Sequence, residues 1–240
     1  MQGFREDKLS FLPLLLVPPL IALVVLVASN ESLLVAERVS FSGTEARAIR
    51  RTESLLAGLP QRGAALGDPD APVTLQFFGD LQCVQSRQVM LGALPFLIRH
   101  WVRGGELRIV YRSTKSDTPD WSEFRGQQIA ALAAGRERKT WTFVDLFYRE
   151  QGPEFTRYAD DGFLERIAEQ ARLDLRRWTS EREVEGWAAK IESEDVLARE
   201  HGLRSTPSFL IGPTGGRARP LLHFSLEEPR VFDEAIRGLL

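Results

Sequence analysis

The sequence predicts an α/β domain in the order βαβ…ββα, with a helical insertion and a membrane-spanning segment before it. Three patterns support this prediction. Strand-like runs flank a helix-like run between residues 73 and 112, helical periodicity fills about 120–200, and two strand-like runs and a helix close the chain. The 240 residues, 43% of them hydrophobic, suffice for one ordinary core. We therefore expect one folded domain.

The first element is an uncharged run over residues 9–30, LSFLPLLLVPPLIALVVLVASN. About twenty apolar residues span a bilayer, so the run predicts a transmembrane helix, kinked where its three prolines lie. Arg5 and Lys8 precede the run and weakly favour a cytoplasmic N-terminus. A signal peptide cleaved after Val27-Ala28-Ser29 is the alternative. We expect residues 1–30 to be a cytoplasmic tip and single-pass signal-anchor in the cell membrane, and either interpretation places the remainder outside the cytoplasm.

Residues 31–66 are mixed in composition and predict a stalk or linker. Ala46, Ile49, Leu55 and Leu56 recur at loosely helical spacing, so the stalk should contain one short helix. The segment ALGDPDAP is dense in turn-forming residues and marks the entrance to the folded domain, which we expect to cover residues 67–240.

A βαβ unit opens this domain. β-Branched and aromatic residues predict strands over 73–78 and 107–112, and the stretch from Cys83 to about Val102 predicts the helix between them. Because the connections are short, the two strands should be parallel, with a right-handed crossover.

The insertion, about 120–200, carries apolar residues at helical spacing and predicts several helices. Gly202 then ends the last of them. PSFLIG and ARPLLHF predict two strands joined by the turn GPTGGR, and SLEEPRVFDEAIRGLL predicts an amphipathic C-terminal helix.

The order of these elements, a cysteine at the first helix and Thr-Pro before a later strand together resemble the thioredoxin superfamily in its DsbA-like branch. The resemblance rests on GDPDAPVTLQFFGDLQC, AALAAGRERKTWTFVDLFYREQG and HGLRSTPSFLIG, and it covers nearly everything after Leu66. It implies a thioredoxin-like fold and thiol–disulfide exchange. The departure lies at the active site, where such proteins typically carry Cys-Pro-X-Cys and this chain has Cys83-Val84-Gln85-Ser86.

Cys83 is the only cysteine, which excludes an internal disulfide and a cysteine-cluster zinc site. At a helix N-terminus, free amide groups and the helix dipole favour the thiolate, the nucleophile of exchange, so we expect an exposed and reactive sulfur. Ser86 lies three positions later on the same face, and its hydroxyl is a candidate hydrogen-bond donor to that sulfur. The alternative is that Cys83 is a small buried hydrophobic residue.

The resemblance also implies a client-binding site. Pro207 is expected in the cis form opposite the sulfur, with Thr206 offering backbone groups to an extended peptide, and Val84 and Gln85 are expected to contact the same client. An ordinary trans proline at the start of a strand is the alternative for Pro207. Such a groove binds extended chain by strand-like pairing.

These observations predict a membrane-anchored extracytoplasmic thiol–disulfide exchange protein with one nucleophile, Cys83. A mixed disulfide on Cys83 cannot be resolved from within, so the protein would act as a monothiol exchanger or isomerase with a small-molecule or protein thiol as partner, or trap its client. Its clients would be cysteine-containing or unfolded extracytoplasmic proteins. The main alternative is a catalytically degenerate binding or chaperone module. A Cys83-linked dimer is a third possibility.

Several other classes of function are not supported. The formal net charge is -2, and basic residues are scattered among acidic ones, so no nucleic-acid partner is predicted. His100, His201 and His223 are too dispersed for a metal motif, and we predict neither a metal nor a cofactor. Asp80, just before the active-site segment, should cap the helix entry rather than carry protons.

Overall fold

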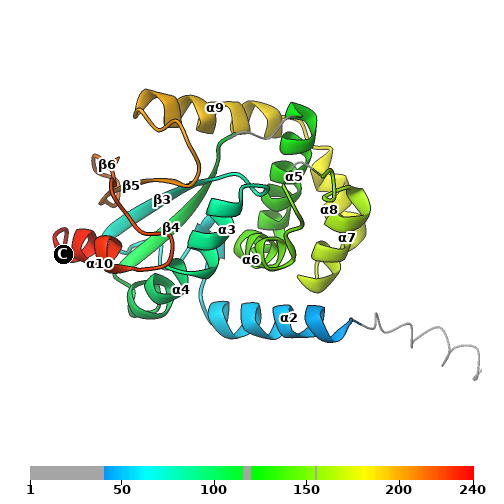
Figure 1. Cartoon of the computed structure of the whole chain (residues 1–240), viewed down its shortest axis with the longest axis horizontal. Helices are drawn as coiled ribbons and strands as arrows, with labels where there is room; N and C mark the ends of the chain where they lie inside the picture. Colours follow the sequence, from blue (N-terminus) through cyan, green and yellow to red (C-terminus); the bar gives the residue numbers. More distant parts are fainter. Residues whose placement is uncertain (1–40, 116–119, 155) are drawn as a thin grey trace, which may run out of the picture. The chain divides into compact units, whose positions relative to one another are not determined.

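The computed structural model describes residues 41–115, 120–154 and 156–240, and residues 43–240 form one compact unit (Figure 1). The predicted transmembrane segment and the cytoplasmic tip lie outside the described residues. Within the described ranges, no helix combines the length and the apolar character needed to cross a bilayer.

A six-stranded mixed sheet forms the centre of this unit, in the order β1-β2-β4-β3-β5-β6. The predicted βαβ unit is confirmed, because β3 (Val73–Gly79) and β4 (Leu107–Ser113) pair in parallel. On the other side of β3, β5 (Ser208–Pro213) pairs antiparallel. The three outer strands are two residues long: β1 (Gln61–Arg62), β2 (Ala65–Leu66) and β6 (Arg219–Pro220).

The inner strands are apolar because helices cover both faces of the sheet. In β3, Val73, Leu75 and Phe77 are fully buried. Phe77 stacks on Phe209 of β5, with ring centroids 5.2 Å apart. The hydrophobic core therefore lies along the whole of β3, whose last residue, Gly79, leads into the turn before α3.

The helix predicted from Cys83 to about Val102 is divided into three pieces. These are α3 (Val84–Leu91), α4 (Leu94–Leu97) and a π-helical turn, η1 (Ile98–Val102). The first break falls at Gly92, where a side chain would approach the carbonyl oxygens of Gln88 and Leu226 to 2.7 Å. The amide of Ala93 donates to Leu226 O, so close approach of the C-terminal segment accounts for the interruption.

The predicted helical insertion is confirmed. Aspartates begin three of its helices, since the side chains of Asp120, Asp160 and Asp174 accept hydrogen bonds from first-turn amides. Figure 1 shows α5 to α8 grouped beside the sheet and α9 running back toward the strands. The elements are α5 (Trp121–Ala133), η2 (Ala134–Glu137), α6 (Thr140–Glu150), α7 (Asp161–Gln170), α8 (Leu175–Arg182) and α9 (Trp187–Glu200).

Residues 43–66, which the sequence suggests are part of a stalk, are packed into the compact unit. Their predicted helix is α2 (Gly43–Leu56), and it buries Ala48, Ile49, Leu55 and Leu56. It contacts α6 by a hydrogen bond from the Thr52 hydroxyl to the Asp145 carboxylate. After α2, β1 and β2 form a short antiparallel pair, and β2 joins the sheet along β4. The apolar face of α2 explains why this segment does not stand away from the domain.

The C-terminal region follows the prediction in part. Only Arg219–Pro220 of the predicted strand ARPLLHF pairs with β5. His223 then adopts a positive φ of 57°, which is incompatible with continuing that strand. The helix is confirmed as α10 (Arg230–Arg237), and its Phe232 and Ile236 are fully buried.

Candidate active site

Three chain segments converge at one edge of the sheet. In the β-sheet register Gly79 lies opposite Ser113, and Phe78 lies opposite Ser208. Because β3 and β4 are parallel and β5 is antiparallel to them, the chain after β3, the chain after β4 and the chain before β5 all meet there. This places Cys83, Lys115 and Thr206 at the same edge of the molecule.

The turn before α3 is held by hydrogen bonds to Asp80, which is fully buried. The amide of Gln82 donates to Asp80 Oδ1 at 3.0 Å, and the amide of Cys83 donates to Asp80 O at 3.0 Å. From behind the turn, the hydroxyl of Tyr148 also donates to Asp80 O at 3.0 Å. The structural role expected of Asp80 at the helix entry agrees with these bonds, because they fix the backbone that presents Cys83.

Cys83 is the N-cap residue of α3, the position that the sequence indicates. Its Sγ lies 3.4 Å from the carbonyl oxygen of Thr206 and donates a hydrogen bond to it. This contact requires the protonated thiol, because a carbonyl oxygen can only accept. The residue is 8% exposed, so the sulfur is less accessible than expected, although it is not remote from the proline loop.

The Thr206–Pro207 peptide bond is cis, as the resemblance implies. Both residues are buried. The carbonyl of Thr206 faces the sulfur. The side-chain Oγ1 of Thr206 is buried and has no hydrogen-bond partner among the described residues. A buried hydroxyl without a partner is uncommon, so the Thr206 hydroxyl has unused hydrogen-bonding capacity.

Ser86 is fully buried one turn along α3 from Cys83. Its Oγ has no hydrogen-bond partner in the described part of the chain, so the donation to the sulfur expected from the sequence is not present in this state. Of the two residues between Cys83 and Ser86, Val84 is half-buried and Gln85 is exposed.

The sequence gives no sign of the residues that brace this helix start from the insertion. Glu154 Oε1 accepts a hydrogen bond from the amide of Val84 at 2.7 Å, so a carboxylate sits at the N-terminus of α3 beside Cys83. Gln151 Nε2 donates to Leu81 O at 2.8 Å and to Cys83 O at 3.2 Å. Only the fold shows that the loop after α6 returns to the cysteine.

Two buried tyrosines stand behind the active-site turn. Burial raises the pKa of Tyr148 well above its usual value, and the neighbouring Tyr111 and the Asp80 carboxylate raise it further. Burial also raises the pKa of Tyr111, again with Asp80 adding to the effect. Both phenols therefore stay neutral and serve as hydrogen-bond donors. Tyr148 donates to Asp80 O, and the Tyr111 hydroxyl lies 3.0 Å from Gln128 Oε1 and 3.2 Å from Gly79 O.

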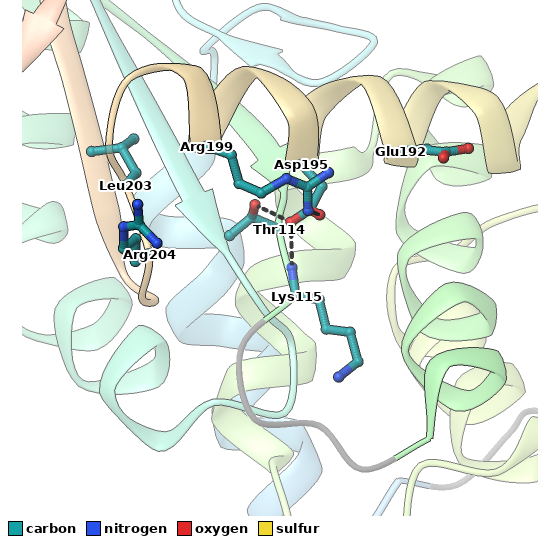
Figure 2. Close-up of a pocket in the computed structure, with 7 residues that line it drawn as sticks. All are labelled: Thr114, Lys115, Glu192, Asp195, Arg199, Leu203 and Arg204. Carbon is teal, nitrogen blue, oxygen red and sulfur yellow. Dashed lines mark hydrogen bonds and ion pairs between the residues drawn. The ribbon is translucent and has the colours of Figure 1, made fainter.

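A polar cavity of about 530 Å³ opens at the same edge, beside the loop that leads to Thr206 (Figure 2). At its centre, Asp195 of α9 accepts from the Thr114 hydroxyl at 2.9 Å and forms an ion pair with Arg199. Leu203 and Arg204 line the cavity from the loop, and Figure 2 shows Lys115 extending away from α9.

No group of three or more metal-ligating side chains occurs within residues 41–115, 120–154 and 156–240.

Comparisons with known proteins agree with this architecture. A family model described as thioredoxin matches residues 61–216. BdbD from Bacillus subtilis is 17% identical, with a TM-score of 0.62, over 77% of this chain and 97% of that one. A thioredoxin-like oxidoreductase from Silicibacter pomeroyi is 24% identical, with a TM-score of 0.56, over 78% and 95%. Alpha-DsbA1 from Wolbachia pipientis is 18% identical, with a TM-score of 0.60, over 78% and 94%. No curated protein sequence matches.

Proposed function

This chain belongs to the thioredoxin superfamily and has a DsbA-like fold, and from that premise we propose that it exchanges thiols and disulfides through one nucleophile, Cys83. The main support for this proposal is the position of the Cys83 sulfur. Sγ lies at the start of α3 and 3.4 Å from the carbonyl of Thr206, the residue before the cis proline. A core cysteine with no chemical role would not need this position.

The exchange step is a nucleophilic displacement. The Cys83 thiol first loses its proton to solvent, and the thiolate attacks one sulfur of a client disulfide. A bond forms between Sγ and that sulfur, the client S–S bond breaks, and the other client sulfur leaves as a thiolate that takes up a proton. The number of disulfides is unchanged, so no outside oxidant is needed.

Release of the client depends on another molecule, because the chain has no second cysteine. An external thiolate, or the thiolate freed on the client, attacks the client sulfur of the mixed disulfide and returns Cys83 as a thiolate. The protein therefore acts as a monothiol exchanger, or as an isomerase when the client's own thiolate attacks.

The backbone of the segment that ends at Pro207 supplies the client contact. When a client cysteine approaches Sγ, the peptide on either side of it can pair with the segment before Pro207 in a strand-like way. The position of Sγ beside this segment and the polar cavity lined by Leu203 and Arg204 support an extended, cysteine-containing protein as client.

The proposed location is the outer face of the cell membrane, with residues 9–30 as the anchor. The uncharged run at 9–30 supports this, and so does the chemistry, because protein disulfides persist outside the cytoplasm.

Mixed-disulfide formation tests the proposal. The full-length protein, in a non-ionic detergent, is incubated with a peptide whose one cysteine is in a disulfide with a small thiol, and intact mass is measured. We expect an adduct of protein plus peptide that an added thiol releases. A peptide too short to extend past its cysteine serves as control and should react more slowly. Failure of the folded protein to form the adduct, while the urea-unfolded chain forms it, would rule out exchange.

The low exposure of Cys83 favours a second candidate, a client-binding module that does not use the sulfur chemically. Under this alternative the Cys83→Ala variant binds a cysteine-free extended peptide as tightly as the natural chain does, and no adduct forms with the disulfide peptide. An adduct with the natural chain would eliminate it as the full account.

A further inference from the structure

A cluster of arginines lines two adjoining cavities between α2, the α3–η1 segment and α6. The larger cavity is about 470 Å³ and the smaller about 150 Å³. They share Arg47, Arg51, Leu91 and Arg149, so they form one groove. Figure 1 shows α2 next to α6. The arginines come from four elements: Arg47, Arg50 and Arg51 from α2, Arg87 from α3, Arg99 from η1 and Arg149 from α6. We call this feature the arginine groove.

The charge of the groove is not balanced locally. Among the described residues, no aspartate or glutamate lines either cavity. Arg149 is paired with the buried Asp145. By contrast, Arg50, Arg51 and Arg99 are exposed, and none of them has an ion-pair partner in the described part of the chain.

This concentration of charge is a local property. The chain as a whole has a formal net charge of -2, so a generally basic composition does not explain it. Like charges held together repel each other, and the folded state carries that cost unless an anion offsets it. Glu53 lies close to Arg50 and Arg51 on α2. Its ion-pair partner is Arg172, however, which lies outside the groove.

The shape and lining indicate the chemistry of the anion. Guanidinium groups match the oxygens of a phosphate in bidentate pairs, and several arginines around one cavity can share the charge of a multiply ionised group. Besides its arginines, the larger cavity is lined by the apolar Leu55, Leu91 and Pro95 and by Ser54. A ligand that joins phosphate oxygens to a less polar part fits this arrangement.

We propose that the arginine groove binds a phosphate-bearing anion, either a free phosphate compound or the headgroup of an anionic phospholipid. This site is separate from the sulfur chemistry, since Cys83 lines neither cavity. Anion binding in the groove can therefore be tested independently of the exchange activity.

Titration of the full-length protein in a non-ionic detergent tests the proposal with three probes: pyrophosphate, dihexanoyl phosphatidylglycerol and the zwitterionic dihexanoyl phosphatidylcholine. We expect saturable binding of at least one of the two anions, tighter than that of phosphatidylcholine, and weaker at higher ionic strength. Tighter binding of pyrophosphate identifies a free anion as the source, and tighter binding of phosphatidylglycerol identifies a lipid headgroup. Absence of saturable binding by both anions overturns the proposal.

Charge reversal locates the site. Arg50→Glu/Arg51→Glu should weaken anion binding by about tenfold or more, since it removes two charge-assisted contacts. The matched control is Arg176→Glu/Arg177→Glu, an adjacent exposed pair on α8 that changes the net charge equally and should alter the affinity by less than about twofold. Arg99→Glu, on a different element, should repeat the loss if the double variant folds poorly. Equal effects of the groove and control variants would overturn the proposal.

Discussion

At the scale of single residues, the N-terminus of α3 and the Glu154 carboxylate have opposite effects on a negative charge at Cys83. The helix N-terminus favours a negative charge on Cys83, whereas the Glu154 carboxylate already occupies the amide of Val84. Glu154 therefore acts as a positioning residue. It stabilises the start of the helix, and its negative charge disfavours the thiolate form of Cys83.

Glu154→Gln should make Cys83 more reactive. The glutamine oxygen can still accept from Val84, but the negative charge beside the sulfur is lost. A charge at an exposed helix end contributes about 0.3–1 kcal/mol, so we expect iodoacetamide to react about two- to fivefold faster at neutral pH. Glu165→Gln, on the exposed side of α7, is the control and should leave the rate unchanged. A slower reaction in the Glu154 variant would show that the carboxylate assists the sulfur instead.

Ser86→Cys should restore a dithiol. The buried hydroxyl of Ser86 has no partner, so a thiol replaces it without breaking a hydrogen bond of the described residues. With dithiodipyridine, the natural chain should retain a mixed disulfide, while the variant should release the reagent by closing a disulfide between Cys83 and the introduced thiol. Intact mass distinguishes the two products.

The matched control is Ser180→Cys, which places the second thiol on the exposed surface of α8. This variant should carry two adducts and close no internal disulfide. If Ser86→Cys also kept both adducts, the spacing at the start of α3 would not be that of an exchange site.

The sequence identifies those site residues that belong to a motif and misses those that belong only to the fold. Cys83 and the cis bond at Thr206–Pro207 were predictable because their order along the chain resembles a known family. Glu154 was not, because it contacts Val84, 70 residues away in sequence, through a side chain in an irregular loop. The low exposure of Cys83 likewise depends on how several segments pack around it.

At the scale of elements, the junction between α2 and α6 depends on a buried carboxylate. Asp145 accepts from the Thr52 hydroxyl, and Arg149 Nε lies 2.7 Å from its Oδ2. Periodicity predicted both helices, but it could not show that α2 packs on α6, because Thr52 and Asp145 carry no pairing signal in the sequence.

Thr52→Val should destabilise this junction. The substitution keeps the shape of the side chain and removes its hydrogen bond to a buried charged group, which typically contributes about 1.5–3 kcal/mol. We expect the free energy of unfolding to fall by that amount in urea denaturation. Ser54→Ala, at an exposed position of the same helix, should change it by less than about 0.5 kcal/mol. Equal stability of Thr52→Val and the natural chain would mean that the bond is not formed in solution.

The free energy of unfolding should depend on pH in a way that reflects the titration of Asp145. Burial raises the pKa of this carboxyl in the folded state, and Arg149 and Thr52 only partly offset the effect. The folded state then binds more protons than the unfolded state between the ordinary pKa and the raised one, so stability falls as pH rises through that interval. Urea denaturation over this pH range should show that Asp145→Asn flattens the slope. An Asp145 contribution that grows with pH would contradict the assignment.

At the scale of the whole compact unit, the sequence predicted the order of elements well because each has a strong local pattern. The interruption at Gly92 was not predicted, because it results from close approach of the distant segment at Leu226. The early end of β6 was not predicted either, because it follows from the positive φ of His223, which has no signal in the sequence. The same limit applies to the arginine groove. Its residues are scattered along the chain, and only the packing of four elements brings them together.

The reaction of the natural protein's one thiol with dithiodipyridine, native and in urea, is the most direct test of the account. Because Cys83 is the only cysteine, the observed rate belongs to that sulfur alone. A sulfur set at a helix start beside the cis proline should react faster in the folded protein than in the unfolded chain at neutral pH. A slower reaction in the folded protein would show that Cys83 is a shielded packing residue, and the exchange function would be contradicted.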